Sequence, residues 1–277
     1  MSKNSLGVFI GRMSLPHEGH FKCIDKMLSE NEESLILIGS SYRSVSLKNP
    51  FTFGERRSII LDHLEHPFDQ DKVLILPIED NPYNNNAWIA DVQYKISGVL
   101  ATRGLSKVRL YHGDKESENS YPSFFPGYQK IAVESAVGTS SKVLNATDLR
   151  SALFEGVDPI HLNLPEVTVK FLEQWKRGKK YQELCEEAKF IKAYKKSWES
   201  APYAPIFVTV DACVVQSGHI ALIQRRDNPG KDLWALPGGF LNPNEKIFDA
   251  CVRELIEETG MKIPEQVLRG SLSLIHI

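Results

Sequence analysis

Three glutamates near the end of the printed sequence could bind a divalent metal. Glu257 and Glu258 follow Glu254 by three and four residues, and apolar residues recur at helical spacing through the same stretch. On a helix such positions share one face, so we expect the three carboxylates to converge. Hard oxygen ligands of this kind suit Mg²⁺ or Mn²⁺, which diphosphate substrates usually bring with them. The pattern predicts a metal-assisted hydrolase centre; the alternative is a solvated acidic helix face.

The residues before this helix complete a longer pattern. Gly239 opens it, Glu245 and Arg253 could pair and hold the glycine loop against the helix, and Gly260 falls where a left-handed cap would end the helix. The spacing over residues 239–261 resembles the signature of the Nudix hydrolases, which cut a diphosphate linking a nucleoside to another group. The resemblance implies metal ligands at Glu254, Glu257 and Glu258, a catalytic role for Glu258, and substrate contacts from Gly239 and Arg253.

Composition favours a soluble protein with more than one domain. The chain has 277 residues, 42% hydrophobic and 25% charged, with a net charge of −2, which is ordinary for globular proteins. The low charge gives no electrostatic reason to expect nucleic acid or an anionic membrane as a partner. Without a long apolar run or signal peptide, and with four isolated cysteines, we expect a cytosol-like compartment and reduced thiols.

Two histidines mark a second candidate site near the start of the chain. An apolar strand over residues 6–10 runs into a glycine-containing turn, and a helix is expected from about residue 19. A strand, a turn and a helix N-terminus present N–H groups and a positive dipole to phosphate. His17 and His20 at the helix entry could both reach a bound anion. Alone, such a histidine pair is more often structural.

The surrounding residues change that interpretation. The pattern resembles the His-x-Gly-His motif of the nucleotidyltransferases, and the longer form that begins Gly11-Arg12 and contains Pro16 resembles the nicotinamide-mononucleotide (NMN) adenylyltransferases. The segment Asn-Pro-Phe-Thr at 49–52, followed by Glu55 and Arg56, is a shared landmark of that family. Thr52 and Glu55 also predict a capping box at a helix start.

Two further segments fit the same family. The polar loop at 78–88 ends on Trp88, which the resemblance places against the nicotinamide ring, a stacking worth about 1–2 kcal/mol when desolvated; a core tryptophan that anchors the loop is the alternative. Residues 145–150 resemble the second phosphate motif, usually Ile-Ser-x-Thr-x-x-Arg, with Leu144 and Asn145 replacing its first two residues. Thr147 is expected to cap the helix and Arg150 to reach the triphosphate.

The alternation of strands and helices over residues 6–156 predicts a parallel, doubly wound, Rossmann-like α/β domain with its site at the strand carboxyl ends. We expect this nucleotidyltransferase domain at 1–178, a bridging helix and linker at 179–204, and a partial Nudix α/β/α domain at 205–277.

Together the motifs resemble an NMN adenylyltransferase fused to a Nudix domain. The resemblance implies transfer of AMP from ATP to NMN, giving NAD and diphosphate, with Mg²⁺ bound chiefly through ATP. His17, His20 and Arg150 would stabilise charge, and the Nudix site would hydrolyse ADP-ribose or a similar compound. The expected substrate-binding residues of the first site are Gly11, Arg12, Gly19, Asn49, Asp80, Trp88, Gly113 and Thr147.

Three points stay open at this stage. A Nudix fold needs roughly 130 residues, so a domain that starts near 205 is expected to be incomplete, with unpaired strand edges and impaired hydrolysis, and residues 271–277 look unlike a natural continuation. The acceptor could instead be pantetheine phosphate or a cytidylyl-type substrate, against which Trp88 and 49–52 argue. The Nudix part could be a non-catalytic sensor of NAD metabolites, and a homo-oligomer is left open.

Overall fold

The computed structural model describes residues 2–64, 72–114, 121–134, 145–203 and 205–261. Its contacts divide the chain into two compact units, Met1–Glu186 and Glu187–Ile277, and the division falls inside helix α7 (Lys179–Ser197). Each unit is described by itself. The domain boundaries expected at 178 and 205 stay predictions, and the expected motif residue Leu144 and the chain end after 261 lie outside the described residues.

The first unit is built on a parallel sheet, which confirms the predicted doubly wound architecture. The strand order is β3-β2-β1-β4-β5, and every neighbouring pair is parallel. The order reverses on the two sides of β1, so the carboxyl ends of β1 and β4 border the crevice where such sheets bind ligands. The strands are β1 (Ser2–Gly11), β2 (Asn31–Ile38), β3 (Val73–Pro77), β4 (Lys107–Gly113) and β5 (Gln129–Val133).

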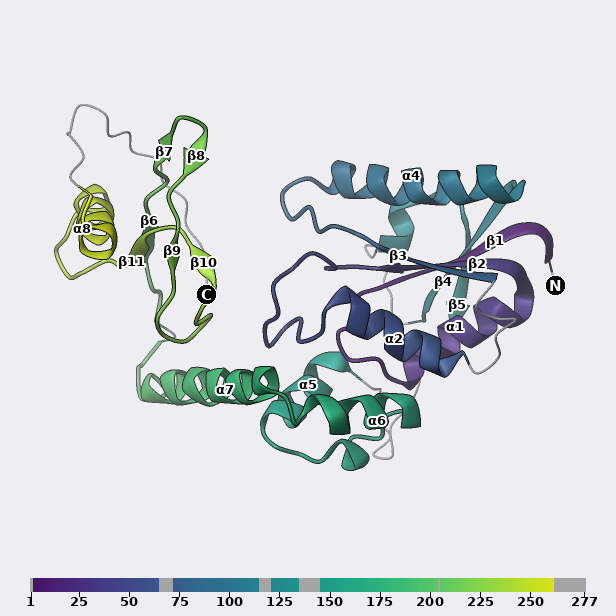
Figure 1. The fold of residues 1–277 in the computed structure, drawn as a ribbon, viewed down its shortest axis with the longest axis horizontal. Coiled ribbons are helices and arrows are strands. Elements are labelled where there is room, and N and C mark those ends of the chain that lie inside the picture. The colour runs from purple at the N-terminus through teal and green to yellow at the C-terminus, as the bar shows by residue number, and fades with distance from the viewer. Residues whose placement is uncertain (1, 65–71, 115–120, 135–144, 204, 262–277) are drawn as a thin grey trace. The chain divides into compact units, whose positions relative to one another are not determined.

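Helices cover both faces of this sheet (Figure 1). Helices α1 (Glu18–Glu30) and α2 (Phe53–His63) pack on one face with Phe9 of β1. Helix α4 (Asn85–Arg103) packs on the other face with Val8 and Ile10. Successive strand residues point to opposite faces, and since both faces are buried there, the inner strands β1 and β2 carry continuous apolar runs rather than alternating ones.

A third apolar cluster lies beside the carboxyl end of the sheet. Leu15 from the turn after β1 and Phe51 from the segment before α2 pack there against α5 (Ala146–Phe154) and α6 (Glu166–Trp175). The Phe51 ring is fully buried and meets the Trp175 ring edge-on, with centroids 4.8 Å apart. This cluster fixes α5 against the turn that carries the histidines. The short 3₁₀ helices η1 (Tyr121–Phe124) and η2 (Pro159–His161) complete the described part of this unit.

The described part of the second unit begins with the last turns of α7 and continues with short antiparallel strand pairs and the helix α8 (Ile247–Thr259). The glycine-rich strand β11 lies against β6 and contacts α8, and Trp198, Phe207 and Phe240 pack edge to face beside it. Gly260 caps α8 with φ +70°, as the sequence predicted. The strands are β6 (Thr209–Asp211), β7 (Val215–Gln216), β8 (His219–Ile220), β9 (Ile223–Gln224), β10 (Trp234–Ala235) and β11 (Gly238–Phe240).

Among the described residues, no helix combines the length and apolar character needed to cross a membrane. The cytosol-like location expected from the sequence stays a prediction.

The third cluster gives a stability test. Phe51→Ala should lower the free energy of unfolding by about 3–5 kcal/mol, because the cavity left among Phe171, Trp175 and α5 cannot collapse fully. Urea denaturation followed by far-UV circular dichroism measures the change. Phe190→Ala removes a ring that is 44% exposed and should cost less than about 1 kcal/mol. Equal effects of the two substitutions would contradict the packing role of Phe51.

Candidate active sites

The turn after β1 carries the first site. Gly11 ends the strand, the Arg12 side chain is exposed, and residues 13–16 are buried. Met13 adopts a left-handed backbone with φ +50°, a conformation that costs a non-glycine residue energy and is commonest at functional sites. The turn delivers the chain directly to the N-terminus of α1, so backbone donors and the helix dipole meet at the end of the central strand.

The two predicted histidines form the N-terminal cap of α1. The His17 Nδ1 atom accepts a hydrogen bond from the Gly19 backbone N–H at 3.1 Å, and His20 Nδ1 accepts one from the His17 N–H at 3.2 Å. A backbone N–H only donates, so neither Nδ1 carries a proton and each neutral ring holds its proton on Nε2. The ring centroids lie 3.9 Å apart. The two rings lie together at the start of α1, where the sequence motif placed both histidines. Both rings offer an Nε2–H donor.

The His20 ring is held in its neutral form. Although its side chain is partly exposed, burial of the ring lowers the pKa of His20 well below 6.5, and the neighbouring His17 lowers it further. Charging either ring would also abolish its capping bond. Near neutral pH His20 therefore acts as a neutral donor through its Nε2–H.

Arg150 reaches this turn from α5. Its Nη1 donates to the Ser14 Oγ at 2.6 Å and its Nη2 to the Thr147 Oγ1 at 3.2 Å. Burial lowers the pKa of Arg150, and the charge of Arg12 lowers it further. Two guanidinium groups with mutual repulsion at the end of β1 favour a bound anion between or beside them.

The expectation that Thr147 caps this helix was wrong. Asn145 is the N-cap residue, and its Oδ1 accepts from the Thr147 N–H at 2.9 Å. The Thr147 hydroxyl instead accepts from Arg150. Asparagine caps a helix as well as serine does, so the departure from the usual motif keeps the helix start and leaves Thr147 to hold the arginine. Ser14, which no sequence argument singled out, anchors the other side of that guanidinium.

The sequence singled out Arg56 only as part of a segment shared with the family. In the structure its side chain makes four hydrogen bonds at the carboxyl ends of the sheet strands. It is fully buried. Its Nη1 donates to the carbonyl oxygens of Arg12 at 2.5 Å and Gly39 at 2.7 Å, its Nη2 to that of Ser40 at 3.2 Å, and its Nε to that of Thr52 at 3.3 Å. Burial lowers the pKa of Arg56 to about 10 against the opposing charges of nearby carboxylates, so the group stays cationic at neutral pH.

Asn49 and Asp80 both contact the turn that follows β2. The Asn49 Nδ2 donates to the Ser40 carbonyl at 3.2 Å, and Asp80 accepts from the Ser40 N–H at 3.2 Å and from Arg43 Nε at 3.1 Å. These bonds tie the loops after β2 and β3 together at the carboxyl edge. The substrate contacts expected of both residues stay predictions.

Trp88 lies in the first turn of α4 rather than in a loop. Its ring is half-buried and meets Phe125 at a centroid distance of 6.0 Å and Phe124 at 6.5 Å. The indole thus anchors the start of α4 and still has exposed surface. Gly113 ends β4, and a Cβ added there would meet nothing within 4 Å, so this strand end is open.

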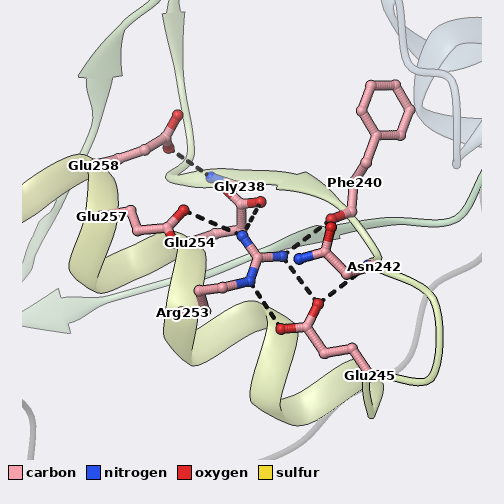
Figure 2. A network of polar contacts seen from close by, with 8 residues as sticks. All are labelled: Gly238, Phe240, Asn242, Glu245, Arg253, Glu254, Glu257 and Glu258. Carbon is pink, nitrogen blue, oxygen red and sulfur yellow. Dashed lines mark hydrogen bonds and ion pairs between the residues drawn. The ribbon is translucent and has the colours of Figure 1, made fainter.

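The second site is organised around Arg253 on α8, as Figure 2 shows. Arg253 Nε and Nη2 donate to Glu245 at 2.8 and 3.0 Å, which confirms the predicted pair, and Nη2 also donates to the Phe240 carbonyl at 3.1 Å. Its Nη1 donates to Glu254 at 2.7 Å and to Glu257 at 3.1 Å. Bonds to Glu245 and then Glu254 raise the pKa of Arg253.

The two glycines of β11 lie where an added Cβ would meet neighbouring atoms. A Cβ added to Gly239 would lie 2.5 Å from a Glu254 oxygen, and one added to Gly238 would lie 2.1 Å from the Val210 carbonyl oxygen. The Gly238 N–H donates to Glu258 at 2.8 Å. Glycine at 238 therefore leaves room for the backbone of β6, and a side chain at 239 would displace the Glu254 carboxylate.

The expected convergence of the glutamates is not seen. Within the residues described, no three or more His, Cys, Asp or Glu side chains are arranged to hold a metal ion. Arg253 engages Glu254 and Glu257, and the Gly238 N–H engages Glu258. The donor type nevertheless fits a hard divalent cation, because three carboxylates stand within one turn of one helix beside a glycine backbone.

Comparison with known proteins finds relatives of both parts of the chain. A family model described as NUDIX domain matches residues 205–274. A nicotinamide/nicotinic acid mononucleotide adenylyltransferase of Acinetobacter baylyi is 30% identical over 177 residues, 64% of this chain and 89% of that protein. A nicotinamide-nucleotide adenylyltransferase of Pyrococcus horikoshii is 27% identical over 181 residues, 65% of this chain and 88% of that protein.

Solved structures that cover 95% of this chain include the following one. It is a bifunctional NMN adenylyltransferase/ADP-ribose pyrophosphatase from Francisella tularensis, complexed with AMP and a manganese ion. It is 32% identical, with a TM-score of 0.82, over 95% of this chain and 76% of that chain. This chain likewise joins a parallel sheet that has a histidine-capped helix to a glutamate helix centred on an arginine. The chain belongs to the family of NMN adenylyltransferases that carry a Nudix domain.

Proposed function

We propose that the first unit transfers AMP from ATP to nicotinamide mononucleotide, giving NAD and diphosphate. The observation that carries this proposal is the gathering of His17, His20 and Arg150 at the end of the central strand, beside the N-terminus of α1. All of these groups are donors, and three kinds of positive potential meet there: ring N–H, guanidinium and helix dipole. Such a site suits a polyphosphate.

The chemistry needs no covalent intermediate on the protein. A phosphate oxygen of NMN attacks the α-phosphorus of ATP, the bond from that phosphorus to the bridging oxygen breaks, and diphosphate leaves with the bond electrons. The Nε2–H groups of His17 and His20 would donate to phosphate oxygens, and Arg150 would neutralise charge on the transferring group. Mg²⁺ bound through ATP would supply further neutralisation of the leaving diphosphate.

The acceptor is the finer part of this proposal. Trp88 and Phe124 form an aromatic corner at the start of α4, and the exposed part of the indole suits a flat cationic ring. This favours NMN over a pantetheine phosphate or cytidylyl-type acceptor, which would have no use for such a corner.

We propose that the second unit hydrolyses ADP-ribose or a similar nucleoside diphosphate with Mg²⁺ or Mn²⁺. Glu254, Glu257 and Glu258 would hold the metal, which would supply an activated water and neutralise the diphosphate. Glu257 is 58% exposed on its side chain, against 14% for Glu254, so it can leave Arg253 with little rearrangement. The complete glutamate set argues against a sensor without catalysis. The impairment expected from an incomplete domain stays a prediction.

Loss of a single donor should slow adenylyl transfer. His20→Asn keeps an acceptor for the His17 N–H but has no Nε2–H, so NAD formation should fall about 100-fold or more while the melting temperature changes little. Arg150→Ala should lower the rate by a similar factor. Arg177→Ala, an exposed arginine after α6, is the control and should retain full activity. Undiminished turnover in both site variants would make these residues structural.

The neutral state of His20 predicts a pH dependence of stability. Its folded-state pKa lies below the unfolded value of about 6.5, so the unfolded chain binds more protons between these two values. The stabilising contribution is therefore complete above about pH 6.5 and is lost as the pH falls through the folded-state pKa. Unfolding free energies measured between about pH 7 and pH 5 should decline less steeply in His20→Asn than in the unaltered chain. Identical slopes would show that His20 is not held neutral.

Charge removal at the second site should abolish hydrolysis without loosening the loop. Gln at position 258 can still accept from the Gly238 N–H, so Glu258→Gln should fold normally but hydrolyse ADP-ribose about 100-fold more slowly and bind Mn²⁺ more weakly. Release of AMP and paramagnetic titration measure these effects. Asp249→Asn, exposed on the same helix, is the matched control. If Glu258→Gln matched that control in rate and metal affinity, the metal role of Glu258 would be wrong.

A further inference from the structure

We infer that Arg56 is a positioning residue for adenylyl transfer, and that it works by holding two left-handed turns at the carboxyl ends of the sheet strands. The inference rests on the proposed function of the first unit. Arg56 itself is fully buried, and each of its hydrogen bonds described above goes to a backbone carbonyl. It therefore acts on substrate only through the segments that it binds.

The bonds of Arg56 fall on the peptide groups that enter two unusual residues. Met13 has φ +50° and Ser40 has φ +52°, and neither is glycine. The Arg12 carbonyl belongs to the peptide that enters Met13, and the Gly39 carbonyl to the peptide that enters Ser40. The same Nη1 atom donates to both carbonyls, at 2.5 and 2.7 Å. One guanidinium nitrogen thus fixes the planes on which both left-handed φ angles depend.

These turns carry the groups that face the phosphates. Fixing the Arg12 peptide sets the direction of the Arg12 side chain and the place of Ser14, which holds Arg150 at 2.6 Å. Fixing the Gly39 peptide directs the Ser40 N–H at Asp80. A small shift of either peptide would move charge-bearing groups of the site, and misplacement on the order of 1 Å costs about 100-fold in rate.

Only arginine can make this set of contacts. Its planar fork presents five N–H donors in fixed directions, whereas a lysine ammonium is a single point at the end of a flexible stem. Arg56→Lys would keep the positive charge. A lysine ammonium could not, however, bind at the same time the carbonyl oxygens that follow β1, those that follow β2 and the one that precedes α2. The two left-handed residues would then be free to relax.

The experiment measures NAD formation by the full chain from ATP, Mg²⁺ and NMN. The unaltered chain must form NAD; if it does not, the proposed function fails independently of this inference. Arg56→Lys should lower kcat about 100-fold, with a smaller change in KM for either substrate. Ile60→Val and Ile60→Ala serve as controls, because Ile60 is buried on the same helix and its truncation loosens α2 without touching the carbonyl bonds. At equal loss of melting temperature they should retain most of their activity.

A second substitution separates positioning from stability. Glycine adopts the left-handed conformation without cost, so adding Ser40→Gly to Arg56→Lys should recover kcat about fivefold or more relative to Arg56→Lys, with Ser40→Gly alone measured as the reference for the double variant. Activity of Arg56→Lys equal to that of the Ile60 controls, or no recovery on Ser40→Gly, would overturn the inference. If Arg56→Lys does not fold, Ser40→Val should be at least about tenfold slower than Ser40→Ala; equal rates of these two would overturn it as well.

Discussion

Burial of both faces of the parallel sheet is the constraint on which the first site depends. Helices α1 and α2 cover one face and α4 covers the other, so the middle of the central strand β1 carries buried apolar side chains. Chemistry is confined to the edge where the strands end. There the chain leaves the sheet, so backbone N–H groups no longer have a hydrogen-bond partner on a neighbouring strand. The helix N-termini at the same place add further N–H groups without an intrahelical partner. The same constraint that makes the core apolar gathers the polar groups at one edge.

At that edge, hydrogen bonds that hold the fold also set the chemistry. The cap bonds of α1 leave each histidine with its remaining proton on Nε2. The bond from Arg150 to Ser14 joins α5 to the turn after β1 and also aims a guanidinium into the site. In the second unit the glycines of β11 leave room for the β6 backbone and the Glu254 carboxylate, and the Gly238 N–H donates to Glu258. A substitution that removes such a bond therefore changes stability and activity together, whereas one that keeps the bond can change activity alone.

Local patterns in the sequence predicted the local structure well. The capping box of Thr52 and Glu55 and the glycine cap of α8 both appear in the structure, because each depends on residues within one turn. The parallel, doubly wound class followed from the alternation of strands and helices, whereas the strand order came only from the structure. The pairing of Arg253 with Glu245 was also predicted, because Arg253 lies on α8 and Glu245 lies two residues before its first residue.

What the sequence could not give were contacts between distant segments. Ser14 and Arg150 are 136 positions apart, and no periodicity links them. The partners of Arg56 are backbone carbonyls, which carry no signature in residue types. Thr147 was misassigned as a cap because asparagine and threonine compete for the same N–H groups and the sequence does not say which wins. The glutamates were expected to converge because helical spacing ignores a neighbouring arginine.

That arginine has a consequence for the second site. By donating to Glu254 and Glu257, Arg253 serves as an internal counterion, so the helix tolerates its cluster of like charges before any metal arrives. A cation bound by these carboxylates, as proposed above, would have to displace the Arg253 guanidinium from Glu254 and Glu257. Its affinity would then also depend on Glu245, whose hydrogen bonds hold Arg253 at 2.8 and 3.0 Å.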